Sequence, residues 1–137
     1  MTEQIKKVIE KYEHPGDFTH PDVTKQILDK ASSDLQISIP EEYTDFLYSY
    51  GHGGINGIEI IGIGKQGNPI FVAETIKYRE YGLPDNLIVI ENCDEWVYCI
   101  DCNTGTVVSW SDGIIENVYP DFNSYLEDRL NDAIENM

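Results

Sequence analysis

The spacing of apolar residues changes near residue 55, and this change restricts the possible folds more than any other feature of the sequence. Upstream, apolar residues recur every three or four positions, as at Ile5, Val8, Ile9 and Tyr12, which is typical of a helix with one buried face. Downstream, they occur in short runs separated by turns rich in glycine and asparagine, which is typical of strands. Helices and strands segregated in this way predict an α+β fold.

The helical spacing predicts four helices. Three lie in the first 50 residues: the first ends near Tyr12, the second covers about 23–31, and the third begins at Pro40 and stops at Gly51. Proline in the first turn and glycine after the last turn are common helix boundaries. The fourth helix starts at residue 120 or 121 and closes the chain.

Six short apolar runs are predicted as strands. They cover residues 58–61, 70–72, 87–90, 97–100, 107–110 and 114–119. Tight turns at 103–105 and 111–113 join the last three runs as antiparallel neighbours, and residues 74–81 fit either a helical turn or a long loop. At 137 residues the chain has the size of one domain, for which roughly 100 to 200 residues is usual. We therefore predict a single α+β domain over 1–137, with N-terminal helices, a central, mainly antiparallel sheet of about five to six strands, and a C-terminal helix.

The N-terminus and the cysteines indicate a reducing compartment. No apolar stretch of the kind found in a signal peptide or a membrane helix follows Met1, which predicts a cytoplasmic protein. Cys93, Cys99 and Cys102 are an odd number of cysteines, so we expect reduced thiols rather than a disulfide framework.

Negative charge is concentrated in the second part of the chain. The net charge is −16, from 25 acidic and 9 basic residues. From Glu80 onward, 13 acids stand against Arg129 alone, a net charge of −12. Such a field repels nucleic acid and anionic membranes, because phosphate binding relies on Lys and Arg, and it favours a basic protein as partner. The alternative is that the charge serves only solubility.

One glycine-rich segment matches a nucleotide-binding motif. Residues 62–67 read Gly-Ile-Gly-Lys-Gln-Gly, and Asp85 follows at about the distance of a ribose-binding acid. The motif requires a helix that opens at the third glycine within a parallel βαβ unit, whereas residues 68–72 resemble a turn and a return strand. We therefore favour a glycine-rich hairpin loop and keep a small nucleotide-binding enzyme as the lesser alternative.

Other patterns that carry chemistry are incomplete. Cys99 and Cys102 have the spacing of half a zinc site, but a structural zinc needs four ligands, and a strand would direct the two side chains to opposite faces. The carboxylates lack the sequence of a calcium loop. The sequence contains no nucleophile motif that could use His52 as a catalytic base, so His52 is expected to lie in a glycine turn. We expect no metal, no cofactor and no enzymatic activity.

Large aromatic residues lie among the acids of the second half. Trp and Tyr are frequent anchors of protein interfaces, although they are also common in cores. An acidic rim around aromatic anchors suits a basic partner. The residues predicted to bind it are Glu91, Asp94, Glu95, Trp96, Tyr98, Asp101, Trp110 and Asp112.

Four segments together resemble the SUKH superfamily, which includes fungal cell-wall synthesis regulators and many bacterial immunity proteins. Residues 35–54 contain Ile-Pro-Glu-Glu-Tyr-Thr-Asp-Phe-Leu followed by Gly-His-Gly-Gly, and 83–90 contain Leu-Pro before an apolar strand. Residues 96–108 contain Tyr-Cys-Ile-Asp and Gly-Thr-Val-Val, and 122–126 read Phe-Asn-Ser-Tyr-Leu. The four segments occur in the family's order over nearly the whole chain.

The resemblance implies an α+β fold and an antitoxin that protects a bacterium from a polymorphic toxin, often a nuclease. Residues 91–96 depart from the glycine-rich turn of many relatives, so specificity there belongs to this protein, and the functional breadth of the superfamily leaves the toxin unnamed. Taken with the charge, the resemblance predicts an immunity protein that occludes the active or nucleic-acid-binding surface of a cationic toxin, with a nuclease as the first expectation. A regulatory scaffold that binds several endogenous proteins is the alternative.

Overall fold

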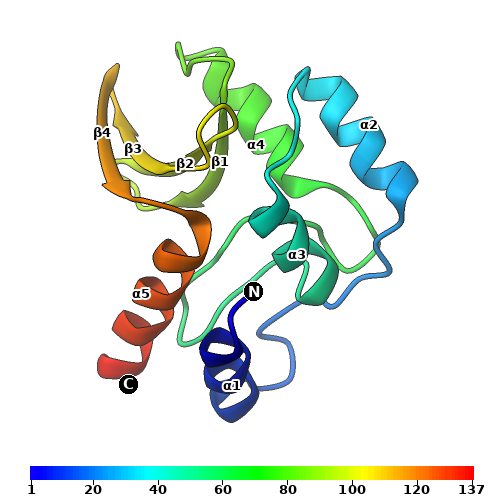
Figure 1. The fold of residues 1–137 in the computed structure, drawn as a ribbon, viewed down its shortest axis with the longest axis vertical. Helices are drawn as coiled ribbons and strands as arrows, with labels where there is room; N and C mark the ends of the chain where they lie inside the picture. Colours follow the sequence, from blue (N-terminus) through cyan, green and yellow to red (C-terminus); the bar gives the residue numbers. More distant parts are fainter.

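The computed structural model describes residues 1–137 as five helices and one antiparallel sheet of four strands, in the order β1-β2-β3-β4 (Figure 1). The elements are α1 (Glu3–Tyr12), α2 (Lys25–Leu35), α3 (Glu41–Ser49), α4 (Ile70–Arg79), β1 (Leu87–Asn92), β2 (Val97–Asp101), β3 (Val107–Ser111), β4 (Ile114–Tyr119) and α5 (Phe122–Glu135). This arrangement confirms the α+β class, the N-terminal helices and the C-terminal helix. The predicted strand number of five to six is wrong, because the sheet has four.

Local sequence signals explain where the predicted helices begin. The side chains of Thr2, Thr24 and Asp121 each accept a hydrogen bond from the backbone N–H three residues ahead, at the starts of α1, α2 and α5. Such caps satisfy N–H groups that have no partner within the helix. Helix α3 begins after Pro40 and carries Glu41 and Glu42 in its first turn, where negative charge is favourable.

The predicted strand at 70–72 is instead the first turn of α4. Phe71, Val72 and Thr75 are the buried residues of this helix, and they lie on one side of it because their spacing follows a helical period. The helix continues through residues 74–79, where the sequence fitted either a helical turn or a loop. Three consecutive apolar residues are compatible with either a strand or a helix. The segment is helical because it belongs to an element of ten residues.

The predicted strand at 58–61 is extended but does not join the sheet as a full strand. Ile60 forms an isolated bridge with Gly53, and the N–H of Ile61 donates to the carbonyl oxygen of Ile90 at 2.8 Å. This segment therefore covers the outer edge of β1 at one point.

The last four predicted strands form a meander in which each strand is antiparallel to the next. The turns at 103–105 and 111–113 had indicated this pairing for the last three of them. Helix α4 packs against β1 on one face of the sheet, where the hydroxyl of Thr75 accepts a hydrogen bond from the N–H of Val89 at 3.1 Å. Helix α5 leaves the end of β4 and lies toward the other face (Figure 1). A β-bulge at Ile90 shifts the β1–β2 register, so that Glu91 pairs with Tyr98.

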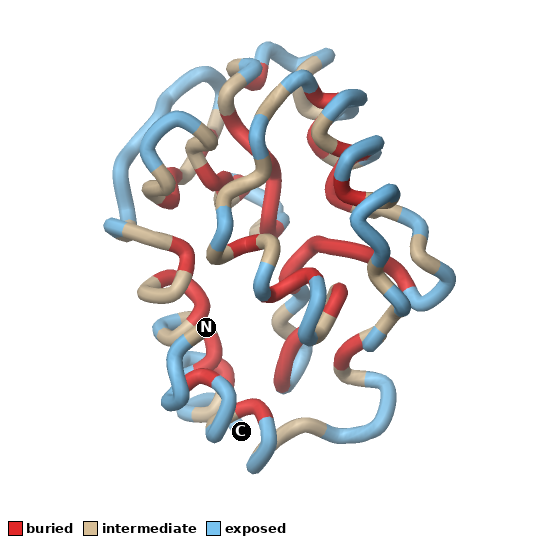
Figure 2. Tube along the Cα trace, turned by 45° about the vertical axis from the view of Figure 1, so that its right-hand side comes forward, coloured by how far each residue is buried: buried red, intermediate tan, exposed pale blue.

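One hydrophobic core of 31 buried residues connects the sheet to the helices. Helix α3 lies at its centre, where the hydroxyl of buried Tyr43 donates to the carbonyl oxygen of Ile61 at 2.5 Å. Figure 2 shows that buried residues form the interior of the chain trace, whereas the outer turns are exposed. None of the helices combines the length and the apolar character needed to cross a bilayer.

Candidate functional site

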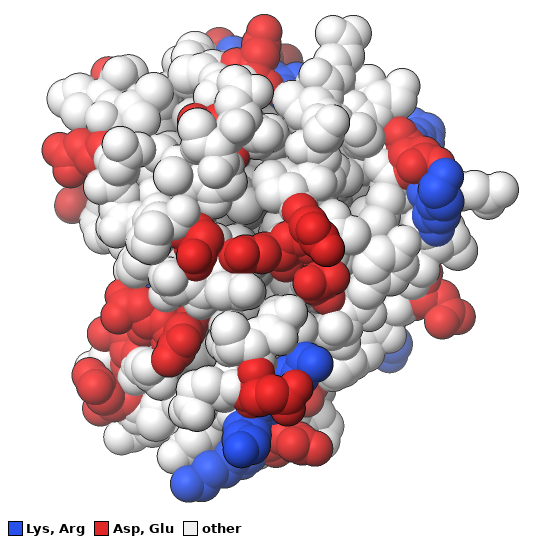
Figure 3. Space-filling model, in the orientation of Figure 1, with Lys and Arg blue, Asp and Glu red and all other residues white.

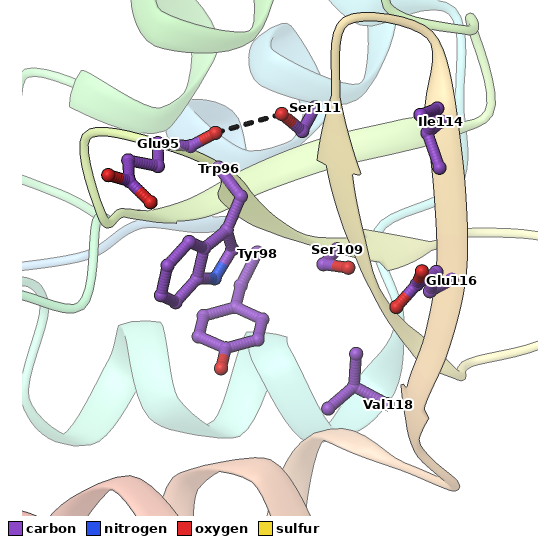
Figure 4. Close-up of a pocket in the computed structure, with 8 residues that line it drawn as sticks. All are labelled: Glu95, Trp96, Tyr98, Ser109, Ser111, Ile114, Glu116 and Val118. Carbon is purple, nitrogen blue, oxygen red and sulfur yellow. Dashed lines mark hydrogen bonds between the residues drawn. The ribbon is translucent and has the colours of Figure 1, made fainter.

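Six of the eight predicted partner-binding residues meet at one end of the sheet. The β1–β2 turn and the β3–β4 turn lie side by side there, and the hydroxyl of Ser111 donates to the carbonyl oxygen of Glu95 at 2.9 Å between them (Figure 4). We call the surface formed by these six residues the turn-end surface. Its members are Asp94, Glu95, Trp96, Tyr98, Trp110 and Asp112.

The two turns present their acids through left-handed backbone conformations. Asp94 has φ 67°, and Asp112 and Gly113 have φ 48° and 84°. Two central residues with positive φ define a type I′ turn, whose twist matches that of the flanking strands. Asp tolerates this conformation better than most residues, so the same side chains that form the tight turns also place carboxylates at their tips.

A groove of about 530 Å³ opens beside the turn-end surface on one face of the sheet (Figure 4). The rings of Trp96 and Tyr98 lie on one side of it, with centroids 6.0 Å apart and planes at 85°. Ser109 lies between these rings and strand β4. We call this the β4 groove. Its lining residues are Glu95, Trp96, Tyr98, Ser109, Ser111, Ile114, Glu116 and Val118.

Sequence reasoning missed the β4 side of the groove. Ile114, Glu116 and Val118 lie on alternate positions of β4, and Ile114 is 65% exposed. The strand itself was predicted from the sequence, but its exposure was not, because exposure depends on the absence of a neighbouring strand at its outer edge.

Trp110 faces the opposite side of the sheet from Tyr98. It is only 7% exposed, and its ring meets that of Tyr78 in α4 at a centroid distance of 6.1 Å. A second hollow on this side is lined by Trp110, Tyr78, Tyr81 and the acids of both turns. Trp96 lines both hollows, so it stands at the ridge between them.

Glu91 is buried and is not part of the turn-end surface, although it lines a neighbouring hollow together with Asp94 and Trp96. It is 4% exposed and accepts a hydrogen bond from the hydroxyl of Tyr125 at 2.8 Å. The guanidinium of Arg129 donates to both of its carboxylate oxygens, at 2.9 and 2.8 Å. This bidentate pair joins β1 to α5, and two-point geometry of this kind is among the strongest charge-assisted contacts.

The contacts with Glu91 shift the pKa values of Tyr125 and Arg129. Burial raises the pKa of Tyr125 well above its ordinary value, and the adjacent Glu91 carboxylate raises it further. The hydrogen bonds to Glu91 raise the pKa of Arg129 although burial opposes this. Arg129, the one base after residue 80, is thus a fixed cation inside the fold.

Asp101 lies at the opposite end of β2 from Trp96. Its carboxylate accepts hydrogen bonds from the amide side chain of Asn86 at 3.0 Å and from the N–H of Asn103 at 2.9 Å. Its carbonyl oxygen accepts from the N–H of Gly105 at 2.7 Å. These contacts fix the β2–β3 turn, so the structure gives Asp101 a role in that turn.

The surface charge follows the division seen in the sequence. In Figure 3, Asp and Glu gather at the lower left over α5 and across the centre of the view, with a smaller group at the left edge, whereas Lys and Arg lie mainly at the bottom over α1 and at the right over α2, with a few at the top. No basic residue lines the β4 groove or the hollow on the α4 side. Arg129 is the one cation beside the turn-end surface: it lines a third hollow together with Asp94 and Trp96, and its guanidinium lies 5.8 Å from the centroid of the Tyr98 ring.

The glycine-rich segment 62–67 does not form a dinucleotide-binding unit, because the sheet contains only antiparallel pairs and α4 begins three residues after Gly67. The loop closes as a hairpin would, with Ile63 bridged to Pro69, but a helix follows in place of the expected return strand. A Cβ on Gly62 would lie 1.8 Å from the carbonyl oxygen of Gly51. Close approach of two backbone segments therefore explains this glycine.

The thiols are free and are held in their neutral form. Burial raises the pKa of Cys93 and of Cys102 to about 12, and the neighbouring carboxylates of Glu91 and Asp101 respectively add to this effect. Fully buried Cys99 shifts in the same direction. No three His, Cys, Asp or Glu side chains are grouped closely enough to hold a metal ion. His52 lies in the glycine turn, where its Nδ1 accepts the N–H of Gly62 at 2.9 Å.

Comparisons with known proteins agree with this fold. The family model SUKH_5, described as SMI1-KNR4 cell-wall, matches residues 1–131. A solved structure described as "Crystal structure of protein from Pseudomonas syringae pv. tomato" is similar at a TM-score of 0.77 and 22% sequence identity. The match covers 96% of this chain and 99% of that chain. At this identity the likeness shows a shared fold.

Proposed function

Because the chain belongs to the SUKH family described as SMI1-KNR4 cell-wall, we propose that it is a binding protein of the immunity type, which neutralises a cationic toxin. The toxin class we expect first is a nuclease. Neutralisation proceeds by occlusion: the turn-end surface covers the toxin's active or nucleic-acid-binding surface, and no chemical step is involved. The proposed partner is a basic protein, and neither nucleic acid nor a membrane is bound directly.

One observation carries this proposal: the turn-end surface combines an exposed aromatic anchor with acids that have no cation of their own. Trp96 is 37% exposed and stands among Asp94, Glu95 and Asp112. None of these three acids forms an ion pair, and Arg129, which lines a neighbouring hollow with Asp94 and Trp96, is paired with Glu91 and Asp132 instead. Interfaces gain most of their affinity from a few aromatic or Arg anchors, while complementary charge accelerates association and selects the partner.

The size of the surface is sufficient for such a complex. A standard interface buries roughly 800 Å² on each partner, and the whole molecule exposes 7369 Å². About a ninth of the surface therefore suffices, so the turn-end surface needs only to be the centre of a larger interface. A nuclease binds the phosphate backbone through Lys and Arg, so a negative surface suits the region it must block.

Co-expression with the toxin domain encoded by the neighbouring gene tests the proposal. We expect growth to be rescued and a complex to be purified, and we expect the double variant Trp96→Ala with Glu95→Lys to abolish both. The double variant Tyr48→Ala with Glu10→Lys is the matched control, since these residues are exposed on α3 and α1, away from the sheet. Absence of rescue and of a complex with the unaltered protein would refute the function.

A regulatory scaffold is the second candidate, because the family includes proteins described by a role at the cell wall. The same surface would then bind endogenous proteins. The genes beside this one separate the two roles: a neighbouring toxin gene favours immunity, and its absence favours the scaffold.

A further inference from the structure

Strand β4 is the uncovered edge of the sheet. It is the last strand in the order β1-β2-β3-β4 and lies on the outside of the molecule (Figure 1). The other edge, β1, is contacted by the N–H of Ile61, but no hydrogen bond from outside the sheet reaches the backbone of Ile115 or Asn117. Proteins usually protect such edges, because free N–H and C=O groups invite another strand.

The β3–β4 turn determines which backbone groups are free. Ser111 and Ile114 flank the two-residue turn and pair with each other. In a hairpin of this type the flanking residues form a hydrogen-bonded pair, and hydrogen-bonded and non-hydrogen-bonded pairs then alternate. Ile115 pairs with Trp110 and Asn117 with Val108. Ile115 and Asn117 therefore direct their N–H and C=O groups away from β3, toward an incoming strand.

The side chains beside this edge specify what it accepts. On the face of the β4 groove, Glu116 lies between Ile114 and Val118, which are 65% and 42% exposed. The row across the sheet continues from Glu116 to Ser109 and then to Tyr98. Because Ser109 is small, the groove stays open from the edge to the aromatic rings (Figure 4).

We propose that β4 binds an extended segment of a basic protein by strand addition, with a Lys or Arg side chain directed into the β4 groove. This rests on the proposed function and specifies how its partner is held. The segment carries its basic residue opposite Glu116 and an apolar residue two positions away on each side, beside Ile114 and Val118. Ile114 and Glu116 are two residues apart and share one face of β4. Val118 is the extra residue of a bulge between Asn117 and Tyr119, and it lines the same groove, so one segment can reach all three positions.

The groove matches a cation in charge and in shape. Glu95 and Glu116 supply carboxylates, and the Trp96 ring lies at nearly a right angle to that of Tyr98, which already has the Arg129 guanidinium 5.8 Å from its centroid. A guanidinium or ammonium within about 6 Å of such ring faces is attracted by the π electrons. A second copy of this chain fits poorly, because it carries a net charge of −16 and would bring its own Glu116 to the shared edge.

A pair of synthetic peptides tests the mode of binding. The first is Thr-Val-Thr-Arg-Thr-Val-Thr, which places arginine opposite Glu116 and the valines beside Ile114 and Val118. In antiparallel register, the two threonines beside the arginine exchange hydrogen bonds with Ile115 and Asn117. The second peptide replaces these two threonines with proline, which removes both donors and keeps the charge.

Titration of the unaltered protein, followed by NMR, gives the readouts. We expect the first peptide to slow amide hydrogen exchange at Ile115 and Asn117, and to bind roughly 30-fold more tightly than its proline counterpart, the effect of about two net hydrogen bonds. Glu116→Gln should weaken the first peptide several-fold, whereas Glu10→Gln on α1 should not. Equal binding of both peptides with unchanged exchange at the two amides would overturn the proposal.

The same measurements on the toxin complex separate the two proposals. A complex that rescues growth but leaves the Ile115 and Asn117 amides unprotected retains the immunity function and overturns strand addition. Protection of these amides by the first peptide, without any toxin complex, retains the strand site and overturns the immunity function.

Discussion

Two glutamates lie in one row across the same face of the sheet and have opposite surroundings. Glu91 on β1 is followed by Tyr98, Ser109 and then Glu116 on β4. Glu91 is buried and paired with Arg129 and Tyr125, whereas Glu116 is exposed and has no ionic partner. A buried carboxylate must be paired to be tolerated, and an exposed one contributes little to stability. The covered side of this face therefore maintains the fold, and the open side is free to bind.

The largest effect is expected on the covered side. Arg129→Met removes the partner of a buried charge, and we expect a loss of about 3 to 5 kcal/mol in the free energy of unfolding. Urea denaturation measures it. Glu116→Gln on the open side is the matched change, for which we expect a difference within about 0.5 kcal/mol. A loss of less than about 1 kcal/mol for Arg129→Met would show that the buried pair is not what separates the two sides.

The second largest effect is expected on the open side. Trp96→Ala should weaken toxin binding by about 2 kcal/mol or more, equal to roughly 30-fold in Kd. Titration calorimetry measures the affinity, and denaturation verifies that the variant is folded. Tyr48→Ala removes an aromatic ring of similar exposure from α3 and should leave the affinity unchanged. If both substitutions weaken the complex equally, the binding site lies elsewhere.

A third test separates local charge from total charge. Glu95→Lys and Glu10→Lys change the net charge equally, but only the first lies at the turn-end surface. We expect Glu95→Lys to slow association roughly tenfold at low salt, and the difference between the variants to shrink as salt screens the interaction. Stopped-flow kinetics at two salt concentrations decides this. Equal slowing would mean that only the total charge attracts the partner.

The smallest effect concerns alkaline stability, and it involves a thiol on the covered side. Burial raises the pKa of Cys93 to about 12, above the ordinary thiol value of about 8.5. The unfolded chain therefore loses this proton first as the pH rises. Its contribution to stability is intact below the unfolded pKa and is lost as the pH approaches 12.

Urea unfolding in reductant at pH 8, 9 and 10 measures this decline. Cys93→Ser should make it shallower and leave the stability near pH 7 almost unchanged. Cys102→Ser, at the other end of the sheet, should act in the same direction, because its pKa is also raised to about 12. Parallel curves for the unaltered protein and both variants would contradict the assigned cause.

Sequence patterns predicted the elements whose signals are local. Capping residues and helical spacing located α1, α3 and α5, and the turns at 103–105 and 111–113 located the hairpins of the meander. The segment at 70–72 was assigned wrongly because a run of three apolar residues has no measurable period. Residues 58–61 were assigned wrongly because an extended segment becomes a strand only when a neighbour supplies continuous hydrogen bonds.

The candidate site was predicted in composition but not in arrangement. The acids and aromatics of the two turns were found because charge and residue type are visible in a sequence. Placing Trp110 on the face opposite Tyr98 requires the register of β2 against β3, in which Tyr98 pairs with Ser109. The exposure of β4 depends on the absence of a fifth strand, which is a property of the whole sheet.

Because of the bulge at Ile90, the number of residues in this part of β1 determines the face of the sheet on which Glu91 lies. In an uninterrupted ladder Glu91 would pair with Val97 and face α4; with the bulge it pairs with Tyr98 and reaches Arg129. Deletion of one residue here would thus move a carboxylate into an apolar layer and leave a cation unpaired. Insertions and deletions should be rejected at residues 89–91 and accepted a few residues later, in the β1–β2 turn. Within one hairpin, the β1–β2 turn can therefore change in length while the adjacent strand stays fixed.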